Sequence, residues 1–362
     1  MFRKQRLLLG VEYGETAVRM VLTEWQKDQF QLIGVAMAPL PMGDVEHTPD
    51  EERKQEINKA LNACLQQLGI KGGKVNFSFA PKNLITRVVR LPEMPKEEMR
   101  AALRWELEKY IPDSVEHYVY DFTQHGREDL EEGPMVRLLL VAVPQEEVKG
   151  FLPGLKKAGL QAVSVETASY ALARLVLSKG DKARPGTLLE LGESRSMLTV
   201  VRDHAVQFIR SIPIGTLQLE ESLAEISGMA REQVRERIRS GALFTHLDLS
   251  LADEVAMEDS LDAALQAKAV RAFLTELVSE VQRSIDYFRL QVREQLDLQL
   301  TVAGELANHP KLAPWMAANL DVAVAPIDLG GLLGERSTAK CHGELRPEMA
   351  VAVGLATRKG LL

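Results

Sequence analysis

Near its start the chain carries Leu7-Leu8-Leu9-Gly10-Val11-Glu12-Tyr13-Gly14-Glu15-Thr16, an apolar run that ends in a glycine turn. A continuous apolar run of this length predicts a buried strand. Apolar patterns over 17–22 and 30–37 predict a second and a third strand. In a dinucleotide-binding domain the first glycine turn leads into a helix, so this strand–turn–strand order indicates a different α/β fold.

The same arrangement returns in the second half of the chain. An apolar strand is expected over 187–191, followed by the turn Gly192-Glu193-Ser194-Arg195-Ser196 and by strands over 197–201 and 205–212. Glu190 and Gly192 correspond to Glu12 and Gly14, at a separation of 190 − 12 = 178 residues. Internal repetition on this scale predicts two related lobes that face one another.

Composition narrows the function classes. The chain has 362 residues, a length that predicts about two globular domains. It carries 44 Lys and Arg against 51 Asp and Glu, and the resulting net charge of −7 argues against a nucleic-acid partner. Cys64 and Cys341 have no partner at metal-ligand spacing and are typical of a reducing cytosol. No apolar run approaches the ~20 residues that span a bilayer, so we expect membrane contact only through a partner.

A helix is expected between Pro95 and Pro112, with Met99, Leu103, Leu107 and Tyr110 on one face and Trp105 off that face. We expect the acidic stretch over 128–132 to be a loop between two strands. A long amphipathic helix is expected over 261–292. The polar linker over 179–186 is the expected boundary between the lobes.

The paired turns suggest phosphate chemistry. Backbone N–H groups in a glycine turn can point at phosphate oxygens, and carboxylates such as Glu12 and Glu190 can hold Mg²⁺ through water. Each turn taken alone is also compatible with a simple hairpin. Arg19 could touch phosphate or could be an exposed strand residue, and Glu166, after a short strand, could reach the cleft or serve a structural role.

Four segments, 10–21, 91–112, 280–288 and 348–356, resemble the PilM family of type IV pilus assembly proteins, which are relatives of FtsA. The resemblance runs in order from about residue 7 to 357, and the segment over 91–112 is its most specific part. It implies an α/β, two-lobed actin-like ATPase fold made of duplicated ribonuclease-H-like domains. The first lobe would cover 1–185, with an FtsA-type inserted subdomain over about 82–155 and a C-terminal helix, 345–362, returning to it. The second lobe would cover 186–344, with a helical subdomain over about 215–292.

The resemblance also implies partners. It indicates a cytoplasmic scaffold, peripheral at the cytoplasmic face of the inner membrane, that binds the short cytoplasmic tail of a PilN-like membrane protein. Pilus motor ATPases and a second copy of the chain are further partners that it allows. The candidate partner-binding residues lie in the most specific segment: Met94, Arg104, Trp105 and Tyr110.

The nucleotide site implied by the resemblance is drawn from five places in the chain. Its residues are Glu12, Gly14, Glu15, Thr16 and Arg19, then Glu190, Gly192 and Ser194, then Arg283 and Ser284, and finally Gly304 and Glu305. ATP would bind there, with Mg²⁺ held by Glu12 and Glu190 through water. The chain departs from its relatives where they carry Asp at positions 12 and 190 and a run of glycines at Ala303-Gly304-Glu305.

Because of these departures, the sequence is compatible with three functions. In the leading interpretation ATP is a conformational ligand of a scaffold whose nucleotide motifs are degenerate, because the side chains of Ala303 and Glu305 would crowd or repel it. No residue that would orient an attacking water is identified, although an active ATPase is the alternative. An actin-like component of a type II secretion system or of a mannose-sensitive pilus is the third possibility.

Overall fold

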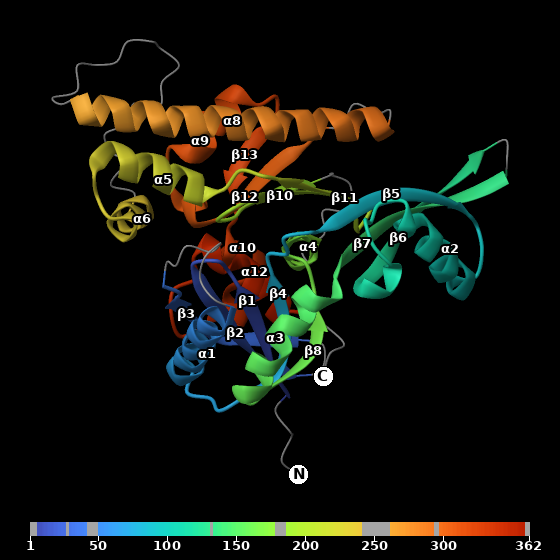
Figure 1. Cartoon of the computed structure of the whole chain (residues 1–362), viewed down its shortest axis with the longest axis horizontal. Helices are drawn as coiled ribbons and strands as arrows, with labels where there is room; N and C mark the ends of the chain where they lie inside the picture. The colour runs from blue at the N-terminus through green and yellow to red at the C-terminus, as the bar shows by residue number, and fades with distance from the viewer. Residues whose placement is uncertain are drawn as a thin grey trace.

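The computed structural model describes residues 6–26, 29–41, 50–130, 133–177, 186–240, 261–292 and 297–358. Within these ranges three β-sheets organise the molecule: one in each lobe and one in a protruding subdomain (Figure 1). Most of the polar linker expected at 179–186 lies outside the described residues. We propose that the lobes divide between the last helix of the first half and the first strand of the second.

The first sheet contains β1 (Arg6–Tyr13), β2 (Ala17–Gln26), β3 (Gln29–Pro39), β4 (Gly73–Phe79) and β8 (Leu160–Val165), in the order β3-β2-β1-β4-β8. β1 pairs antiparallel with β2 and parallel with β4. The central position of β1 explains its continuous apolar run, because a central strand covered on both faces has no solvent side.

The second sheet repeats this topology strand for strand. It contains β9 (Gly186–Leu191), β10 (Ser196–Arg202), β11 (Ala205–Ile212), β12 (Gln299–Gly304) and β13 (Ala323–Pro326), in the order β11-β10-β9-β12-β13. β9 pairs antiparallel with β10 and parallel with β12, as β1 does with β2 and β4. The duplicated α/β architecture expected from the two glycine turns is therefore confirmed.

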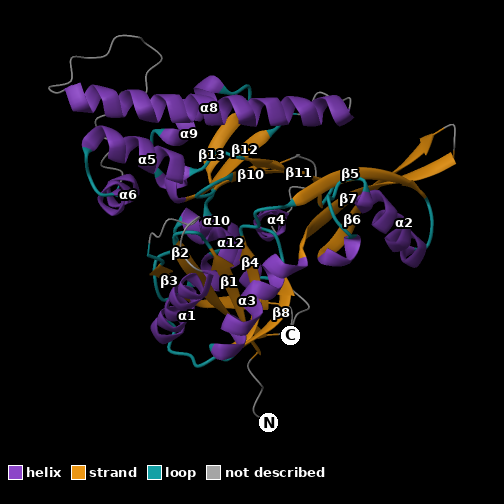
Figure 2. Ribbon diagram, in the orientation of Figure 1, coloured by secondary structure: helices purple, strands orange, loops and turns teal. Residues whose placement is uncertain are grey.

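Helices cover the first sheet on both faces. α1 (Asp50–Gln67) and α3 (Gln145–Lys157) enclose one apolar core with the sheet. α4 (Ala168–Leu177) and α12 (Ala350–Ala356) lie between the two sheets (Figure 2). Their core also includes residues of the second sheet, such as Leu188 and Ile209, so a continuous apolar core joins the lobes.

The second sheet carries α5 (Thr216–Ser227), α6 (Arg231–Arg239), α8 (Leu261–Val292) and α9 (Leu312–Asn319). The apolar stripe of α8 is buried as its periodicity predicts, including Leu274, Val281 and Phe288. Shorter elements are α10 (Leu329–Leu333), α11 (Glu335–Thr338) and the 3₁₀ turns η1 (Val115–His117), η2 (Glu305–Asn308) and η3 (Pro347–Met349).

The protruding subdomain contains β5 (Ile85–Pro92), α2 (Lys96–Glu108), β6 (Tyr118–Leu130) and β7 (Gly133–Pro144), with sheet order β5-β7-β6. α2 packs on this sheet through Met99, Leu103 and Leu107, three of the four residues that its spacing predicts. The prediction for the fourth, Tyr110, is wrong, because the helix ends at Glu108 and Tyr110 is 39% exposed beyond it. The loop expected at 128–132 is partly wrong, because Glu128 and Asp129 extend β6 and pair with β7. Residues 131–132 lie outside the described residues.

The subdomain is fastened to the second lobe as well as to the first. Thr86 Oγ1 donates to the Ile209 carbonyl at 2.9 Å, and Arg137 donates to the Gln207 side chain at 3.1 Å. The Arg195 guanidinium, in the turn after β9, donates to the carbonyls of Pro81 and Lys82 at 3.1 and 3.0 Å. A movement of the second lobe would therefore act on the subdomain.

Candidate functional site

The turns after β1 and β9 line one shared cavity between the lobes, so the topology brings Gly14 and Gly192 together. Gly14 N donates to the Ala17 carbonyl at 3.0 Å and closes the first turn. A Cβ at Gly192 would lie 2.3 Å from the Arg195 carbonyl oxygen, which explains the glycine there. The repeated sequence pattern thus places two tight turns against each other.

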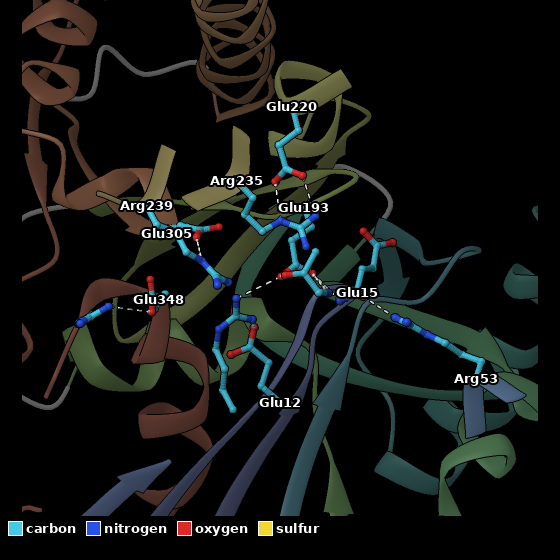
Figure 3. Close-up of polar contacts among 12 residues, drawn as sticks. Glu12, Glu15, Arg53, Glu193, Glu220, Arg235, Arg239, Glu305 and Glu348 are labelled. Carbon is cyan, nitrogen blue, oxygen red and sulfur yellow. Dashed lines mark hydrogen bonds and ion pairs between the residues drawn. The ribbon is translucent and has the colours of Figure 1, made fainter. Parts of the chain in front are cut away.

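Glu193 of the second turn reaches into the first turn (Figure 3). Its carboxylate accepts hydrogen bonds from two consecutive backbone N–H groups, those of Glu15 and, at 3.2 Å, Thr16. The Thr16 hydroxyl donates to the same carboxylate, as does the Arg19 guanidinium at 3.1 Å. Four donors of the first lobe therefore converge on one carboxylate of the second.

Further contacts fasten the two turns. Ser194 Oγ donates to the Glu15 carboxylate at 2.7 Å, and Arg53 on α1 donates to the Glu15 carbonyl. The Glu15 and Glu193 side chains thus point in opposite directions across the contact. The lobes are held together in a closed arrangement at this point.

The cavity is acidic. Six carboxylates line it, against the guanidinium groups of Arg19 and Arg195; the six are Glu12, Glu15, Glu190, Glu193, Glu305 and Glu348. Burial raises the pKa of Glu12 to about 7, although Arg19 opposes the shift. Burial, reinforced by the charges of Glu12 and Glu193, raises the pKa of Glu190 to about 8.

Glu193 differs from its acidic neighbours. Burial alone would raise its pKa, but the Arg19 charge and the hydrogen bonds from Thr16 and Glu15 hold the pKa of Glu193 below its usual value. Hydrogen bonds donated to a carboxylate favour its ionised form. Glu193 is therefore an anion in this contact at neutral pH.

In this conformation the cavity does not fit a nucleotide. Its volume is about 70 Å³, whereas sites for small organic ligands usually enclose ~300–1,000 Å³. The donors that could hold a phosphate in the first turn already bind Glu193. Among the described residues no group of three or more His, Cys, Asp or Glu is placed to hold a metal ion.

The third turn, after β12, borders the same cavity. Gly304 has φ +105°, and a Cβ there would lie 2.3 Å from the Leu191 carbonyl oxygen. Ala303 is buried, and the Glu305 carboxylate pairs with Arg239 on α6. The side chains that the sequence marks as departures at this turn are thus packed or paired within the protein.

Arg283 and Ser284, on α8, are not among the residues that line the cavity. Arg283 is exposed and pairs with Glu280, whereas Ser284 is buried and donates to the Glu280 carbonyl at 2.6 Å. Their assignment to nucleotide remains a prediction. Sequence reasoning missed Glu193 and Glu348: Glu193 lies between two residues singled out in the repeated turn, whereas Glu348 reaches the cavity only through the return of the C-terminal segment.

A second cavity, of about 470 Å³, forms a groove between the protruding subdomain and the first lobe. β6 and β8, each at an edge of its sheet in the described strand order, contribute to its walls. The apolar lining includes Phe79, Val119, Val143 and Val165, and the polar lining includes Asp121, Thr123, Glu166, Arg174 and Arg358. Glu166 therefore lies in this groove, paired with Arg174 at 2.6 Å and with Arg358.

The four predicted partner-binding residues lie elsewhere on the subdomain and do not line the groove. Trp105 on α2 is 70% exposed, and Arg104 pairs with Glu116. Met94 packs against the core beneath α2, and Arg87 lies 5.0 Å from the centre of the Tyr110 ring. Their role in partner binding remains a prediction.

Comparison with known proteins connects this architecture to FtsA. The chain is 19% identical over 315 residues to cell division protein FtsA of Streptococcus pneumoniae, covering 81% of this chain and 67% of that protein. It is 24% identical over 227 residues to FtsA of Enterococcus faecalis, covering 57% of this chain and 51% of that protein. The chain thus spans about half of the second relative's length.

Comparison with solved structures and with protein families gives the same relationship. A solved structure described as a PilM-PilN type IV pilus biogenesis complex matches with a TM-score of 0.76 and 24% identity, over 96% of this chain and 97% of that one. The fold is the actin-like ATPase fold. No helix in the described ranges is both long and apolar enough to span a bilayer. The pattern defining the type IV pilus assembly protein PilM matches residues 10–360, and the chain belongs to that family.

Proposed function

We propose that this protein is a scaffold of type IV pilus assembly that binds the short cytoplasmic tail of a PilN-like inner-membrane protein. The groove of about 470 Å³ between the protruding subdomain and the first lobe is the observation that carries the proposal. The similarity to a PilM-PilN complex supports the choice of partner. The partner would hold the scaffold at the cytoplasmic face of the inner membrane and within reach of the pilus motor ATPases.

The groove has the features that an extended peptide requires. Edge strands have backbone groups that an added strand can pair with, and alternate side chains of that strand can enter apolar pockets. β6 and β8 provide such edges, and both contribute residues to the lining of the groove. Val119 on β6 is 39% exposed at the groove, so its side chain has apolar surface for a partner to cover.

The test is titration calorimetry of the full chain with the PilN-like tail peptide. We expect Val119→Asp to weaken binding by about tenfold or more, because a charge would be buried in the apolar wall. Leu152→Asp is the matched control: Leu152 is 40% exposed on α3 and does not line the groove. Failure of the wild-type chain to bind the tail, or equal loss in both variants, would contradict the proposal.

Trp105→Ala, measured in the same titration, tests the sequence-based assignment separately. A loss of affinity with Trp105→Ala and none with Val119→Asp would move the partner site from the groove to the exposed face of α2. The two surfaces lie on different elements, so the two variants distinguish them.

Regulation by ATP is the finer part of the proposal. Phe79, Pro81 and Thr167 line both the acidic cavity and the groove, so the two cavities are neighbours. The subdomain is also hydrogen-bonded to the second lobe through Thr86 and Arg137. A ligand that binds better to a more open arrangement of the lobes would change the groove and thereby the tail affinity. This role requires no hydrolysis.

A further inference from the structure

We infer that Glu193 is an internal anion that occupies the phosphate-binding turn of the first hairpin, so that a nucleotide phosphate binds there only after displacing this carboxylate. The inference rests on the proposed regulation by ATP for the identity of the competing ligand. The contact itself is a feature of the closed structure.

The donors around Glu193 are those that an external anion would use. Consecutive backbone N–H groups in a turn form an anion-binding concavity, and a guanidinium adds a charge-assisted hydrogen bond. The N–H groups of Glu15 and Thr16, the Thr16 hydroxyl and Arg19 supply this set. Because all four donate to Glu193, a phosphate at this turn competes for the same hydrogens.

The backbone fixes Glu193 in place. The N–H groups of Thr216 and Leu217, in the first turn of α5, donate to the carbonyls of Gly192 and Glu193 at 3.1 and 2.9 Å. A Cβ at Gly215 would lie 2.1 Å from the Glu193 carbonyl oxygen, so the glycine allows this close approach. The carboxylate is therefore presented from a supported turn rather than from a free loop.

Charge favours the internal anion over phosphate in the closed state. The cavity around this turn is lined by acidic side chains, and a phosphate would bring more negative charge into it than the single carboxylate of Glu193. Removing Glu193 would both free four donors and remove one negative charge. Both effects strengthen the binding of a polyphosphate, so Glu193 determines whether this site accepts one.

The experiment compares wild-type chain with Glu193→Ala and Glu193→Gln. Calorimetry measures ATP affinity with and without Mg²⁺, and hydrogen exchange followed by NMR measures the amides of Glu15 and Thr16 without nucleotide. Glu147→Ala is the control, because its carboxylate also accepts from two consecutive backbone N–H groups, those of Lys82 and Asn83, at 2.8 and 3.3 Å.

We expect Glu193→Ala to bind ATP at least tenfold more tightly than wild type and to exchange the two amides at least tenfold faster. Glu193→Gln keeps the shape of the side chain and loses its charge. Its ATP affinity and its amide exchange rates should lie between those of wild type and Glu193→Ala, and it provides a second test if the alanine variant misfolds. Glu147→Ala should match wild type in both measurements.

Equal ATP affinity in wild type and both Glu193 variants would overturn the inference, as would unchanged amide exchange. Absence of ATP binding in all variants would overturn it too and would remove ATP from the proposed function. Tail binding to the groove is measured without nucleotide, so its failure is separate from each of these outcomes.

Discussion

Arg19 lies between two carboxylates that belong to different lobes. Its guanidinium is 3.4 Å from Glu12 and 3.1 Å from Glu193, and the residue is only 5% exposed. The expectation of an exposed strand arginine is therefore wrong: β2 is covered, and the side chain is buried at the contact between the lobes. Removing one partner of a buried ion pair typically costs ~3–5 kcal/mol, because the other charge remains buried.

At the same scale we expect Glu190→Gln to stabilise the protein at alkaline pH. Burial and the neighbouring carboxylates raise the pKa of Glu190 from 4.5 to about 8. The folded state then binds more protons than the unfolded state between these values, so stability falls as pH rises from about 4.5 towards 8. The variant avoids this loss and should be more stable than wild type by about 1–3 kcal/mol at pH 8.5.

Urea denaturation at pH 6 and pH 8.5 measures this difference. Glu147→Gln, outside the acidic cavity, serves as the control and should show no gain that grows with pH. If wild type and Glu190→Gln lost stability in parallel on going to pH 8.5, the Glu190 carboxyl would not carry the pH dependence.

Among the elements, α12 shows how a short helix of small residues can be a central part of the fold. All residues of α12 are buried, and the helix contacts β1, β2, β4 and α4. A Cβ at Gly10 on β1 would lie 2.1 Å from the Ala352 carbonyl oxygen, and one at Gly354 would lie 2.2 Å from the Ala171 carbonyl oxygen. Glycine at both positions lets α12 fit between the sheet and α4.

We therefore expect Gly354→Ala to lower the free energy of unfolding by about 2–3 kcal/mol, because the added methyl group overlaps backbone that cannot easily move. Gly150→Ala is the matched control within helix α3, where an added Cβ meets no atom within 4 Å. Alanine should stabilise that helix by about 0.5–1 kcal/mol. Thermal and urea unfolding of both variants measures these two changes in stability, which should have opposite signs. A Gly354→Ala variant as stable as wild type would contradict the packing argument.

At the level of the whole molecule, the protruding subdomain contacts the second lobe and also forms one wall of the groove. Its hydrogen bonds reach β11 of the second lobe, and Arg195, in the turn after β9, donates to the carbonyls of Pro81 and Lys82 just before β5. The groove lies between this subdomain and β8 of the first lobe. Opening of the lobes should therefore draw one wall of the groove away from the other.

The corresponding prediction is that Glu193→Ala weakens tail binding about 3- to 10-fold, although Glu193 does not line the groove. Arg195→Met, which cuts the hydrogen bonds to Pro81 and Lys82, should reduce this effect when the two substitutions are combined. A double-mutant cycle with the tail peptide measures the coupling. An unchanged tail affinity in Glu193→Ala would show that cleft and groove are independent, and strictly additive effects would show that the Arg195 hydrogen bonds do not carry the coupling.

Local sequence patterns were enough to predict the secondary structure that frames the site. The strand–turn–strand motif at 7–22, its repeat at 187–201 and the apolar stripe of α8 are properties of neighbouring residues, because strand and helix periodicity act over a few positions. The glycines of the two turns follow from the same local geometry. The length of the β6–β7 hairpin did not, because Glu128 joins the strand only through pairing with Met135 on β7.

The sequence alone determined the repeated strand–turn–strand pattern of the two lobes and their two glycine turns, since each is carried by contiguous residues, and the resemblance to a known family implied the inserted segment. Only the tertiary structure decided that Glu193 binds Thr16, 177 residues away, that six carboxylates line one cavity, and that β6 and β8 border a groove. The physical reason is that such contacts depend on how the two sheets and the subdomain pack together, and no local periodicity encodes that placement.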